Sequence, residues 1–346
     1  MINKKSFVLL LFALLLLGCK TSDSEKKKLI NVQEYILPIE ENAEVTSFYY
    51  KDGEIYYNVS HLSYYEMMIT ETSGGYRYTD DLSTEIHVYD VECDTDELVY
   101  RFDDTRPTEI TNILATTDTI YWEEYSDTGF SICSITKNVD GVYLPPERLF
   151  TSADIESTMY SISPCIYNDI LYWYEPNDIY FRLVGYENGH IYKHQNDIFL
   201  SSPYETPLMA NGLFSYAKKE DTIKVFSTKA LKETEVIDCS FSDIGTVFSG
   251  KHFITWTDGY YHNYDIEVYN IREKSAKKLD LDYFFSIGLI DDFLFVDTDK
   301  ELLMYQCDSL EKIKSWPGRY LFILQNDEGD LFCQNLDTGG ILIITK

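Results

Sequence analysis

Short apolar runs that follow polar turns recur seven times along the chain. In each unit a two-residue turn, rich in Asn, Asp and Gly, precedes a run of aromatic or aliphatic residues. The turns occupy positions 52–53, 117–118, 168–169, 211–212, 250–251, 291–292 and 328–329. Gly, Asn and Asp tolerate positive φ, whereas Tyr, Phe, Trp and Ile favour extended backbone, so each unit predicts a β-hairpin.

Further strands are predicted in the units after these hairpins. Their apolar patterns lie at 85–91, 130–136, 179–185, 222–227, 265–270 and 302–307. With the loops removed, four strands fit into about forty residues, which is the size of a propeller blade. All-β repeats of this length predict sheets that pack radially around an axis.

The repeats resemble those of β-propellers over residues 35–346. Thr255-Trp256-Thr257-Asp258 is close to the YWTD signature, and Tyr121-Trp122 and Tyr172-Trp173 echo it. The chain is in this respect similar to YWTD-type and TolB-like propellers. The resemblance implies an all-β, seven-bladed β-propeller, with six or eight blades as the alternatives.

The last unit is one strand short. Only two strands, at 330–334 and 341–345, follow the turn at 328–329, while the early run at 34–39 precedes the first unit and belongs to none. In propeller families a strand in this position commonly completes the last blade. We therefore predict that the N-terminal strand closes the last blade, which removes an exposed sheet edge.

The N-terminus has the pattern of a signal peptide. Lys4 and Lys5 precede the apolar run 7–17, which is too short to span a bilayer. Leu16-Leu17-Gly18-Cys19 resembles the lipobox of bacterial lipoproteins. The resemblance implies that residues 1–18 are removed and that Cys19 is acylated.

Three segments follow from this reading: a lipoprotein signal peptide at 1–18, a lipid-anchored tether at 19–33, and a β-propeller domain at 34–346. Because two or three acyl chains hold a protein on a membrane, the expected location is extracytoplasmic, on the cell membrane or the outer membrane. The tether is charged and poor in apolar residues, and its lysines at 26–28 are expected to face lipid head groups.

Composition excludes several classes of partner. The chain has 29 Lys and Arg against 58 Asp and Glu, for a formal net charge of −29, and 45% of its residues are hydrophobic. That apolar content is too high for a disordered acidic tail. The negative charge repels phosphate backbones, so no nucleic acid is expected as a partner, and the folded part has no basic surface for an anionic membrane.

Six cysteines remain after Cys19, scattered at long intervals without a CxxC pair. They are Cys93, Cys133, Cys165, Cys239, Cys307 and Cys333. A chain of this length supplies its own apolar core without disulfides. Free, buried cysteines are therefore expected rather than a disulfide framework.

Two loops between the second and third strands of their units have the composition of a binding surface. Tyrosine offers rigid area with a polar tip, and long loops are usually functional or disordered. The candidates are Tyr64, Tyr65, Tyr76, Arg77 and Tyr78 in the loop 60–84, and Tyr260, Tyr261 and His262 in the unit that contains Trp256. The alternative is that these residues are solvated hairpin tips.

Other acidic and histidine groups have both a chemical and a structural interpretation. The pairs Asp94 and Asp96, Asp280 and Asp282, and the trio Asp297, Asp299 and Glu301 either share a cation or are turn acids that face solvent. His190 and His194 have the spacing of a helical metal pair but lie in strand-like sequence. Glu123, Glu124 and Glu175 offer carboxylates for glycoside chemistry.

Motifs of other catalytic classes are missing from the sequence, among them GxSxG, GxxxxGK[ST], GxGxxG and zinc-type cysteine clusters. No cofactor, metal or catalytic residue is therefore assigned. The leading hypothesis is a lipid-anchored extracytoplasmic propeller that binds a protein or glycan. The alternatives are a carbohydrate-active enzyme that acts on envelope or host glycans, and an envelope-assembly scaffold, whose family repeat motif this chain lacks.

Overall fold

The structure is a computed structural model. It describes residues 30–40, 43–60, 84–102, 109–126, 129–151, 164–177, 180–187, 189–199, 208–210, 213–219, 222–227, 232–238, 244–258 and 265–346. The chain divides into two units, Met1–Asn31 with Lys346 and Val32–Thr345. In the part of the chain that is described, no helix has the length and apolar composition needed to cross a bilayer.

The described strands form seven four-stranded sheets, and consecutive strands within a sheet pair antiparallel. Sheet 1 contains β2 (Glu44–Lys51), β3 (Glu54–Ser60), β4 (Thr84–Asp90) and β5 (Thr95–Arg101). Sheet 2 contains β6 (Glu109–Ala115), β7 (Thr119–Ser126), β8 (Gly129–Thr136) and β9 (Glu147–Thr151). Sheet 3 contains β10 (Cys165–Tyr167), β11 (Ile170–Asn177), β12 (Tyr180–Glu187) and β13 (His190–Phe199).

The same order of strands continues in the next three sheets. Sheet 4 contains β14 (Leu208–Ala210), β15 (Leu213–Lys219), β16 (Thr222–Ser227) and β17 (Lys232–Asp238). Sheet 5 contains β18 (Ile244–Ser249), β19 (Phe253–Asp258), β20 (Asp265–Asn270) and β21 (Ser275–Asp280). Sheet 6 contains β22 (Ser286–Ile290), β23 (Phe293–Asp297), β24 (Glu301–Gln306) and β25 (Lys312–Pro317). The predicted hairpins and further strands are confirmed within a few residues wherever they are described.

Sheet 7 combines the two ends of the described chain. It contains β26 (Tyr320–Gln325), β27 (Leu331–Asn335), β28 (Ile341–Thr345) and β1 (Asn31–Tyr35), in the order β1-β28-β27-β26. The strand expected at 34–39 lies earlier, because Pro38 has no N–H to donate and the Ile39 N–H bonds back to the Leu37 carbonyl at 2.9 Å. That tight turn ends the extended segment.

Left-handed backbone at the hairpin turns explains their composition. Asp52 and Gly53 have φ of 51° and 85°, and Asn168 and Asp169 have φ of 51° and 58°. Two successive residues with positive φ match the type I′ turn that fits the twist of paired strands. The turn at 117–118 is also tight, and it is closed by a backbone hydrogen bond from the Thr116 N–H to the Thr119 carbonyl at 2.8 Å.

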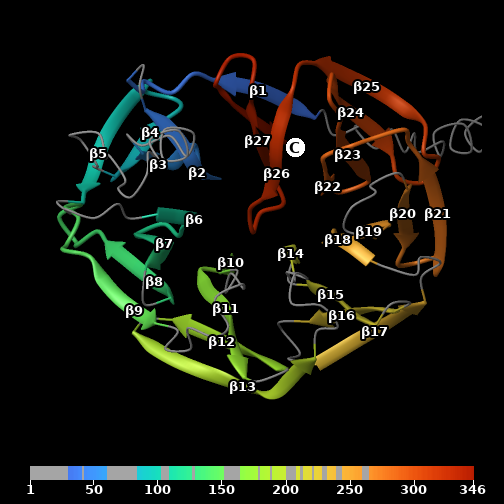
Figure 1. Cartoon of the computed structure of the whole chain (residues 1–346), viewed down its shortest axis with the longest axis horizontal. Helices are drawn as coiled ribbons and strands as arrows, with labels where there is room; N and C mark the ends of the chain where they lie inside the picture. The colour runs from blue at the N-terminus through green and yellow to red at the C-terminus, as the bar shows by residue number, and fades with distance from the viewer. Residues whose placement is uncertain are drawn as a thin grey trace, which may run out of the picture. The chain divides into compact units, whose positions relative to one another are not determined.

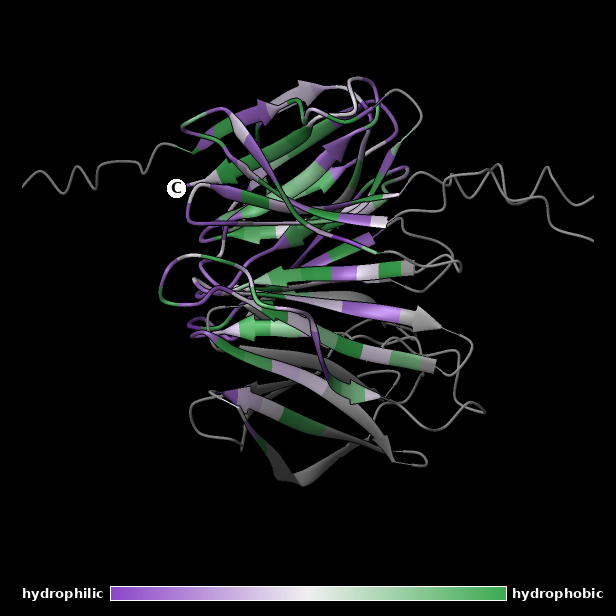
Figure 2. Ribbon diagram, turned by 90° about the vertical axis from the view of Figure 1, so that its left-hand side faces the viewer, coloured by the Kyte–Doolittle hydropathy of each residue, from purple (hydrophilic) through white to green (hydrophobic). Residues whose placement is uncertain are grey.

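Within Val32–Thr345 the first strand of each sheet lies innermost and the fourth lies outermost (Figure 1). Green hydrophobic and purple hydrophilic stretches both occur along the strands, and purple stretches also lie at several of the turns that join them (Figure 2). The second strands carry the largest fully buried side chains, among them Tyr57, Trp122, Trp173, Trp256 and Phe295. Contacts between successive sheets bury these side chains, so the core is a series of layers between sheets.

The cysteines that the structure describes are free, as predicted, but the prediction that they are all buried is wrong for Cys93, which lies in the exposed turn between β4 and β5. Cys133, Cys307 and Cys333 are buried, Cys165 is partly buried, and Cys93 is exposed. Burial raises the pKa of the Cys133 thiol to about 12, which makes it chemically inert. Cys239 lies outside the described residues.

Sheets 6 and 7 approach closely at Gly288 in β22. A Cβ at this position would lie 2.6 Å from Ile323 Cγ2 and 2.9 Å from Leu331 Cδ1. The Gln325 side chain also donates from Nε2 to the Leu289 carbonyl at 2.6 Å. Glycine is therefore required here by the distance between two sheets rather than by a turn.

Gly288→Ala should lower the free energy of unfolding by about 1–3 kcal/mol, because the added methyl group overpacks the layer between sheets 6 and 7. Chemical denaturation monitored by tryptophan fluorescence measures the change. Gly250→Ala is the matched control, since its Cβ would have its nearest neighbour at 3.5 Å, an ordinary contact. Equal stability of the two variants would contradict the close approach.

Candidate functional site

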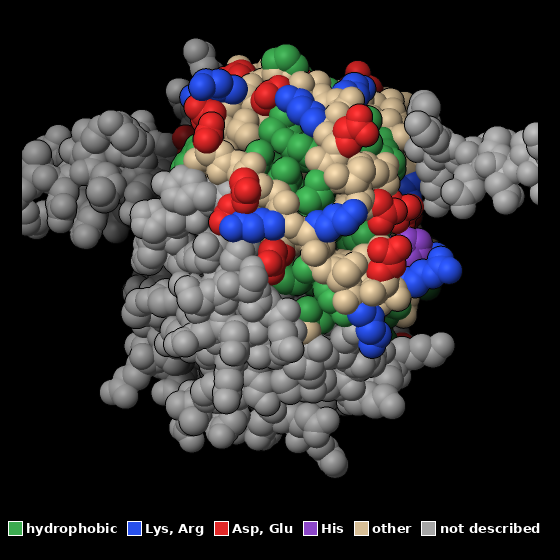
Figure 3. All heavy atoms as spheres, turned by 90° about the vertical axis from the view of Figure 1, so that its right-hand side faces the viewer, with side chains coloured by type: hydrophobic (Ala, Val, Ile, Leu, Met, Phe, Trp, Pro, Cys, Tyr) green, Lys and Arg blue, Asp and Glu red, His purple; other side chains and the backbone are tan. Residues whose placement is uncertain are grey.

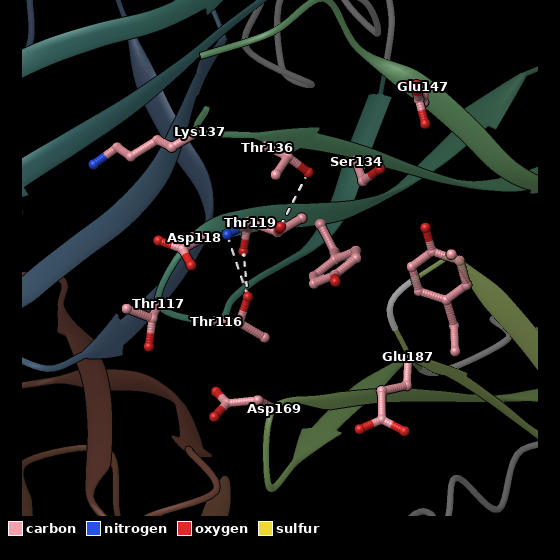
Figure 4. Close-up of a pocket in the computed structure, with 13 residues that line it drawn as sticks. Thr116, Thr117, Asp118, Thr119, Ser134, Thr136, Lys137, Glu147, Asp169 and Glu187 are labelled. Carbon is pink, nitrogen blue, oxygen red and sulfur yellow. Dashed lines mark hydrogen bonds between the residues drawn. The ribbon is translucent and has the colours of Figure 1, made fainter. Parts of the chain in front are cut away.

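A cleft of about 630 Å³ lies between sheets 2 and 3 (Figure 4). Thirteen residues line it, namely Thr116, Thr117, Asp118, Thr119, Tyr121, Ser134, Thr136, Lys137, Glu147, Asp169, Tyr186, Glu187 and Gly189. We call it the turn-end cleft, because these residues belong to the β6–β7, β10–β11 and β12–β13 turns and to the neighbouring ends of β7, β8, β9 and β12. Its volume is within the range of small-ligand sites.

Hydrogen bonds among threonines fix the sheet 2 wall of the cleft. Thr116 Oγ1 accepts from the Thr119 N–H at 3.2 Å, and the Thr119 and Thr136 hydroxyls lie 3.0 Å apart. These residues face one another because Thr119 and Thr136 are cross-strand partners on β7 and β8. The wall is thus held by the hairpin and does not depend on a ligand.

Two tyrosines from different sheets meet in the cleft. The rings of Tyr121 and Tyr186 lie 6.4 Å apart at 81°, an edge-to-face pair. Burial raises the pKa of both phenols, and the Glu147 carboxylate raises that of Tyr186 further. The tyrosines therefore stay neutral and offer ring surface together with a hydroxyl.

Carboxylates dominate the charge of the cleft. Asp118 and Glu147 come from sheet 2, and Asp169 and Glu187 face them from sheet 3. Lys137 is the basic residue among the thirteen, and its ammonium lies over the Tyr143 ring, 4.8 Å from the ring centroid. Figure 4 shows its side chain extending away from the other labelled residues.

The acidic character of the cleft contrasts with the outer strands. On the side that carries β21 and β25, acidic and basic side chains are interspersed (Figure 3). Lys278 pairs there with Asp265 at 2.5 Å, and Lys312 pairs with Glu301 at 3.2 Å. Charge on that side is locally balanced, whereas the cleft has four carboxylates, of which Asp169 pairs with Lys51 at 3.7 Å, and one lysine that lies over a tyrosine ring.

A buried lysine joins the cleft to the neighbouring sheets. Lys51 is 5% exposed, and its Nζ lies 3.1 Å from Asp327 Oδ1 and 3.7 Å from Asp169 Oδ1. Burial opposes the charge on Lys51, but the carboxylate of Asp327, followed by that of Asp169, outweighs it and raises the pKa of the amine. The turns of sheets 1, 3 and 7 therefore meet at one ammonium group.

The binding residues predicted from the sequence are not tested by the structure. Tyr64, Tyr65, Tyr76, Arg77, Tyr78, Tyr260, Tyr261 and His262 lie outside the described residues, as does the predicted acylation site Cys19. Ser60 and Thr84, which flank the longer loop, pair at the end of sheet 1 opposite the 52–53 turn. The cleft lies at the turn end of the sheets, whereas the predicted binding loop that follows Ser60 leaves sheet 1 at the opposite end.

Most of the acidic pairs turn out to be held by local partners. Asp94 accepts from the Tyr89 hydroxyl at 2.6 Å, and Asp96 accepts from the Tyr57 hydroxyl at 2.8 Å. Lys278 also approaches Asp280 at 3.6 Å, and Lys300 approaches Asp299 at 3.5 Å. Within the described residues no cluster of three or more His, Cys, Asp or Glu side chains is placed to hold a metal ion.

His87 in sheet 1 lies between two carboxylates. Its Nδ1 is 2.9 Å from Asp96 Oδ2, and its Nε2 is 2.8 Å from Glu85 Oε2. Each ring nitrogen of His87 therefore has a carboxylate partner within sheet 1, one on β4 and one on β5.

Of the carboxylates considered for glycoside chemistry, Glu123 and Glu124 do not form a facing pair. Glu123 and Glu124 are adjacent on β7, so their side chains point to opposite faces of sheet 2. Glu123 is fully buried and accepts from Asn112 Nδ2 at 2.5 Å, while Glu124 pairs with Arg148 at 3.3 Å. Nothing is described of the Glu175 side chain.

His190 and His194 both lie on β13, in strand rather than helix. Residues four apart on a strand are separated by roughly 13 Å, because each residue advances the chain by about 3.3 Å. The spacing that would bring two imidazoles together on a helix therefore does not do so here. The strand-like interpretation of this segment is confirmed.

Asp297 is an acid that lacks a basic partner among the described residues. It is fully buried at the end of β23, where Ser286 Oγ donates to Oδ2 at 3.4 Å and Oδ1 has no hydrogen-bond partner among the described atoms. Burial raises the pKa of this carboxyl to about 7, against hydrogen bonds from Ser286 and the Tyr320 backbone. Asp297 thus does not belong to a cation site with Asp299 and Glu301.

No family model and no curated protein matches the sequence. Among solved structures, the chain is similar to the WD40 beta propeller domain of Doa1, with 9% identity, a TM-score of 0.55, and coverage of 92% of this chain and 98% of that one. The chain folds as a β-propeller.

Two further similarities are more distant. A chain of the mitotic checkpoint complex aligns with 9% identity and a TM-score of 0.51, covering 76% of this propeller and 84% of that chain. BamB from Moraxella catarrhalis aligns with 10% identity and a TM-score of 0.45, covering 76% and 79%. At such identities the similarity to Doa1 shows the fold alone.

The propeller should be less stable at alkaline than at acidic pH because of Asp297. With a folded-state pKa of about 7 and an unfolded value near 3.9, the folded state alone binds this proton between about pH 4 and pH 7. Stability from this group therefore falls as the pH rises through that window. Asp297→Asn cannot titrate, so relative to the native chain it should gain about 1–3 kcal/mol between about pH 5 and pH 8.

Denaturation curves at the two pH values measure this gain. Asp299→Asn is the matched control, because Asp299 is exposed two residues away, and its curves should stay parallel to those of the native chain. A pH-independent difference between Asp297→Asn and the native chain would contradict the burial of a titrating carboxyl.

Proposed function

We propose that this chain is a lipid-anchored, extracytoplasmic binding module, a seven-bladed propeller that holds a protein or glycan at the turn end of its sheets. The observation that carries the proposal is the turn-end cleft. Side chains from two neighbouring sheets converge there on a space of about 630 Å³, with acidic groups, hydroxyls and aromatic rings in one place. This combination is typical of binding sites, in which a few polar groups fix the orientation of a ligand.

The proposed seven blades are the seven sheets of the described chain, with β1 as the strand that closes the last blade. In support, β1 lies beside β28 in sheet 7. Phe332 of sheet 7 contacts Phe48 and Tyr49 of sheet 1, with ring centroids 5.8 and 5.5 Å apart. Asn326 Nδ2 also donates to the Tyr50 carbonyl at 3.0 Å. Contacts of this kind are what closure between the last and first blades requires.

The proposed location rests on the N-terminal sequence. A positive segment, a short apolar run and Cys19 after Gly18 resemble a lipoprotein signal peptide. The acidic body then faces the outside of the cell. Because its net charge is negative, it repels nucleic acids and favours cationic or uncharged partners. Neither a cofactor nor a metal is part of this proposal.

Replacing Cys19 with Ser should abolish incorporation of labelled fatty acid and release the protein from the membrane fraction, because the thiol is the acceptor of the proposed anchor. Metabolic labelling and fractionation of cells that express the full chain measure both effects. Cys93→Ser is the control, since Cys93 is exposed on the folded body and should have no influence. Continued acylation without Cys19 would contradict the proposed anchor.

Affinity capture tests the binding function directly. The full-length protein with a C-terminal tag is purified from its own solubilised envelope at low and at physiological salt, and retained proteins and glycans are identified. Double substitution Glu147→Gln and Glu187→Gln should reduce retention of the partner by about tenfold, because two wall carboxylates are lost. Glu311→Gln, an exposed acid at the same end outside the cleft, should leave retention unchanged.

The same capture contains the result that would contradict the proposal. A partner retained equally by the native chain and by the double variant would place binding elsewhere on the molecule. No retained protein or glycan at either salt concentration would count against a binding module altogether.

A further inference from the structure

We infer that the turn-end cleft is a carbohydrate site for a short oligosaccharide that contains amino sugars and no acidic groups. The inference rests on the proposed binding function and adds the chemistry of the ligand. Three independent features of the cleft carry it: the hydroxyl of the largely buried Ser134, a pair of tyrosine rings from two sheets, and an excess of carboxylates.

Ser134 supplies the hydroxyl. The residue is 5% exposed and lines the cleft, and no hydrogen bond to its side chain is found among the described residues. A hydroxyl can donate one hydrogen bond and accept others, so in the wall of the cleft it is a position where a ligand donor or acceptor completes a hydrogen bond. Ser134 lies directly across the strand pair from Tyr121, which places the hydroxyl and the aromatic ring on the same face of sheet 2.

The tyrosine pair suits a sugar ring. Sugars present C–H groups on one face and hydroxyls at their edge, which matches an aromatic ring with polar groups around it. Tyr121 is 6% exposed and forms the inner part of the cleft, while Tyr186 is half-buried and belongs to the facing wall. Thr116, Thr119 and Thr136 add hydroxyls beside the first ring. A volume of about 630 Å³ accommodates more than one sugar unit.

The charge of the cleft selects among sugars. Asp169 and Glu187 lie on one side of the space, and Glu147 lies on the other (Figure 4). Carboxylates accept hydrogen bonds from hydroxyls and attract ammonium groups, while they repel uronic acids and phosphates. The Lys137 ammonium lies over Tyr143 and is not turned toward these groups. Lys51 pairs with Asp169 at 3.7 Å, so the charge that selects the ligand comes mainly from Glu147 and Glu187. An oligosaccharide with free amines therefore fits better than a neutral one, and an acidic one does not fit.

Calorimetric titration of the full-length protein with three trisaccharides tests this order. Chitosan trisaccharide carries an amine on each ring, its fully N-acetylated form has the same linkages without charge, and trigalacturonic acid carries carboxylates. At mildly acidic pH and low salt, the amino form should bind about tenfold more tightly than the acetylated form, and the acid should not bind. Binding of the acid, or failure of both chitosan-derived sugars, would overturn the inference.

Variants assign the binding to the cleft. Ser134→Ala and Tyr186→Leu should each weaken both the amino and the acetylated sugar by about tenfold, because they remove a hydrogen bond or a ring. Glu147→Gln with Glu187→Gln should weaken mainly the amino form and narrow the difference between the two. Glu311→Gln is the control for charge, and thermal unfolding shows that each variant is folded. Equal affinities in all variants would contradict this site.

The sugar titration tests the carbohydrate assignment, and the envelope capture tests the binding function, so the two proposals can be contradicted independently. A retained partner that depends on Glu147 and Glu187, combined with no response to any sugar, would leave the binding module intact and overturn the carbohydrate assignment. No response in either experiment would overturn both.

Discussion

A four-stranded sheet with two apolar faces cannot bury both of them by itself, and this constraint organises the whole chain. In β4, Ile86 and Val88 are buried on one face and Tyr89 on the other, and in β24 the four central residues 302–305 are all buried. Each sheet therefore needs a neighbour on either side. Outermost strands do not need such a neighbour. In β21, for example, most residues are exposed, and the strand carries charged side chains.

The same constraint explains where a binding site is available. The faces of the inner strands are covered by neighbouring sheets, so side chains from two sheets can line an open space at the ends of the strands, where the turns lie. The turn-end cleft is such a place, with rigid hairpins on both walls. Its connection to Lys51, and through Lys51 to Asp327 of sheet 7, ties the site to contacts between the first and last sheets. Position and rigidity of the site thus follow from the packing of the fold.

Much of this architecture is readable from the sequence, because its signals are local. Turn residues such as Asp52 and Asn168 need positive φ, and the aromatic runs after them need an apolar layer. The N-terminal strand was placed three residues too late because its apolar pattern continues through Pro38, whose missing N–H ends the pairing. The cleft has no local signal: it joins residues around 116–137 to residues around 169–189, and only the packing of two sheets brings them together. The sequence also suggests a cation site of Asp297 with Asp299 and Glu301, because they are close along the chain. In the fold, Asp297 is instead hydrogen-bonded by Ser286 and the Tyr320 backbone.

We propose that ligand recognition takes place at the turn end, between sheets 2 and 3. An experimental structure of the protein bound to chitosan trisaccharide is the decisive measurement. We expect ligand density beside Tyr121 and Tyr186, with a sugar oxygen or nitrogen within hydrogen-bond distance of Ser134 Oγ. Density at the opposite end of the sheets, near the loop that follows Ser60, with an empty turn-end cleft, would contradict it.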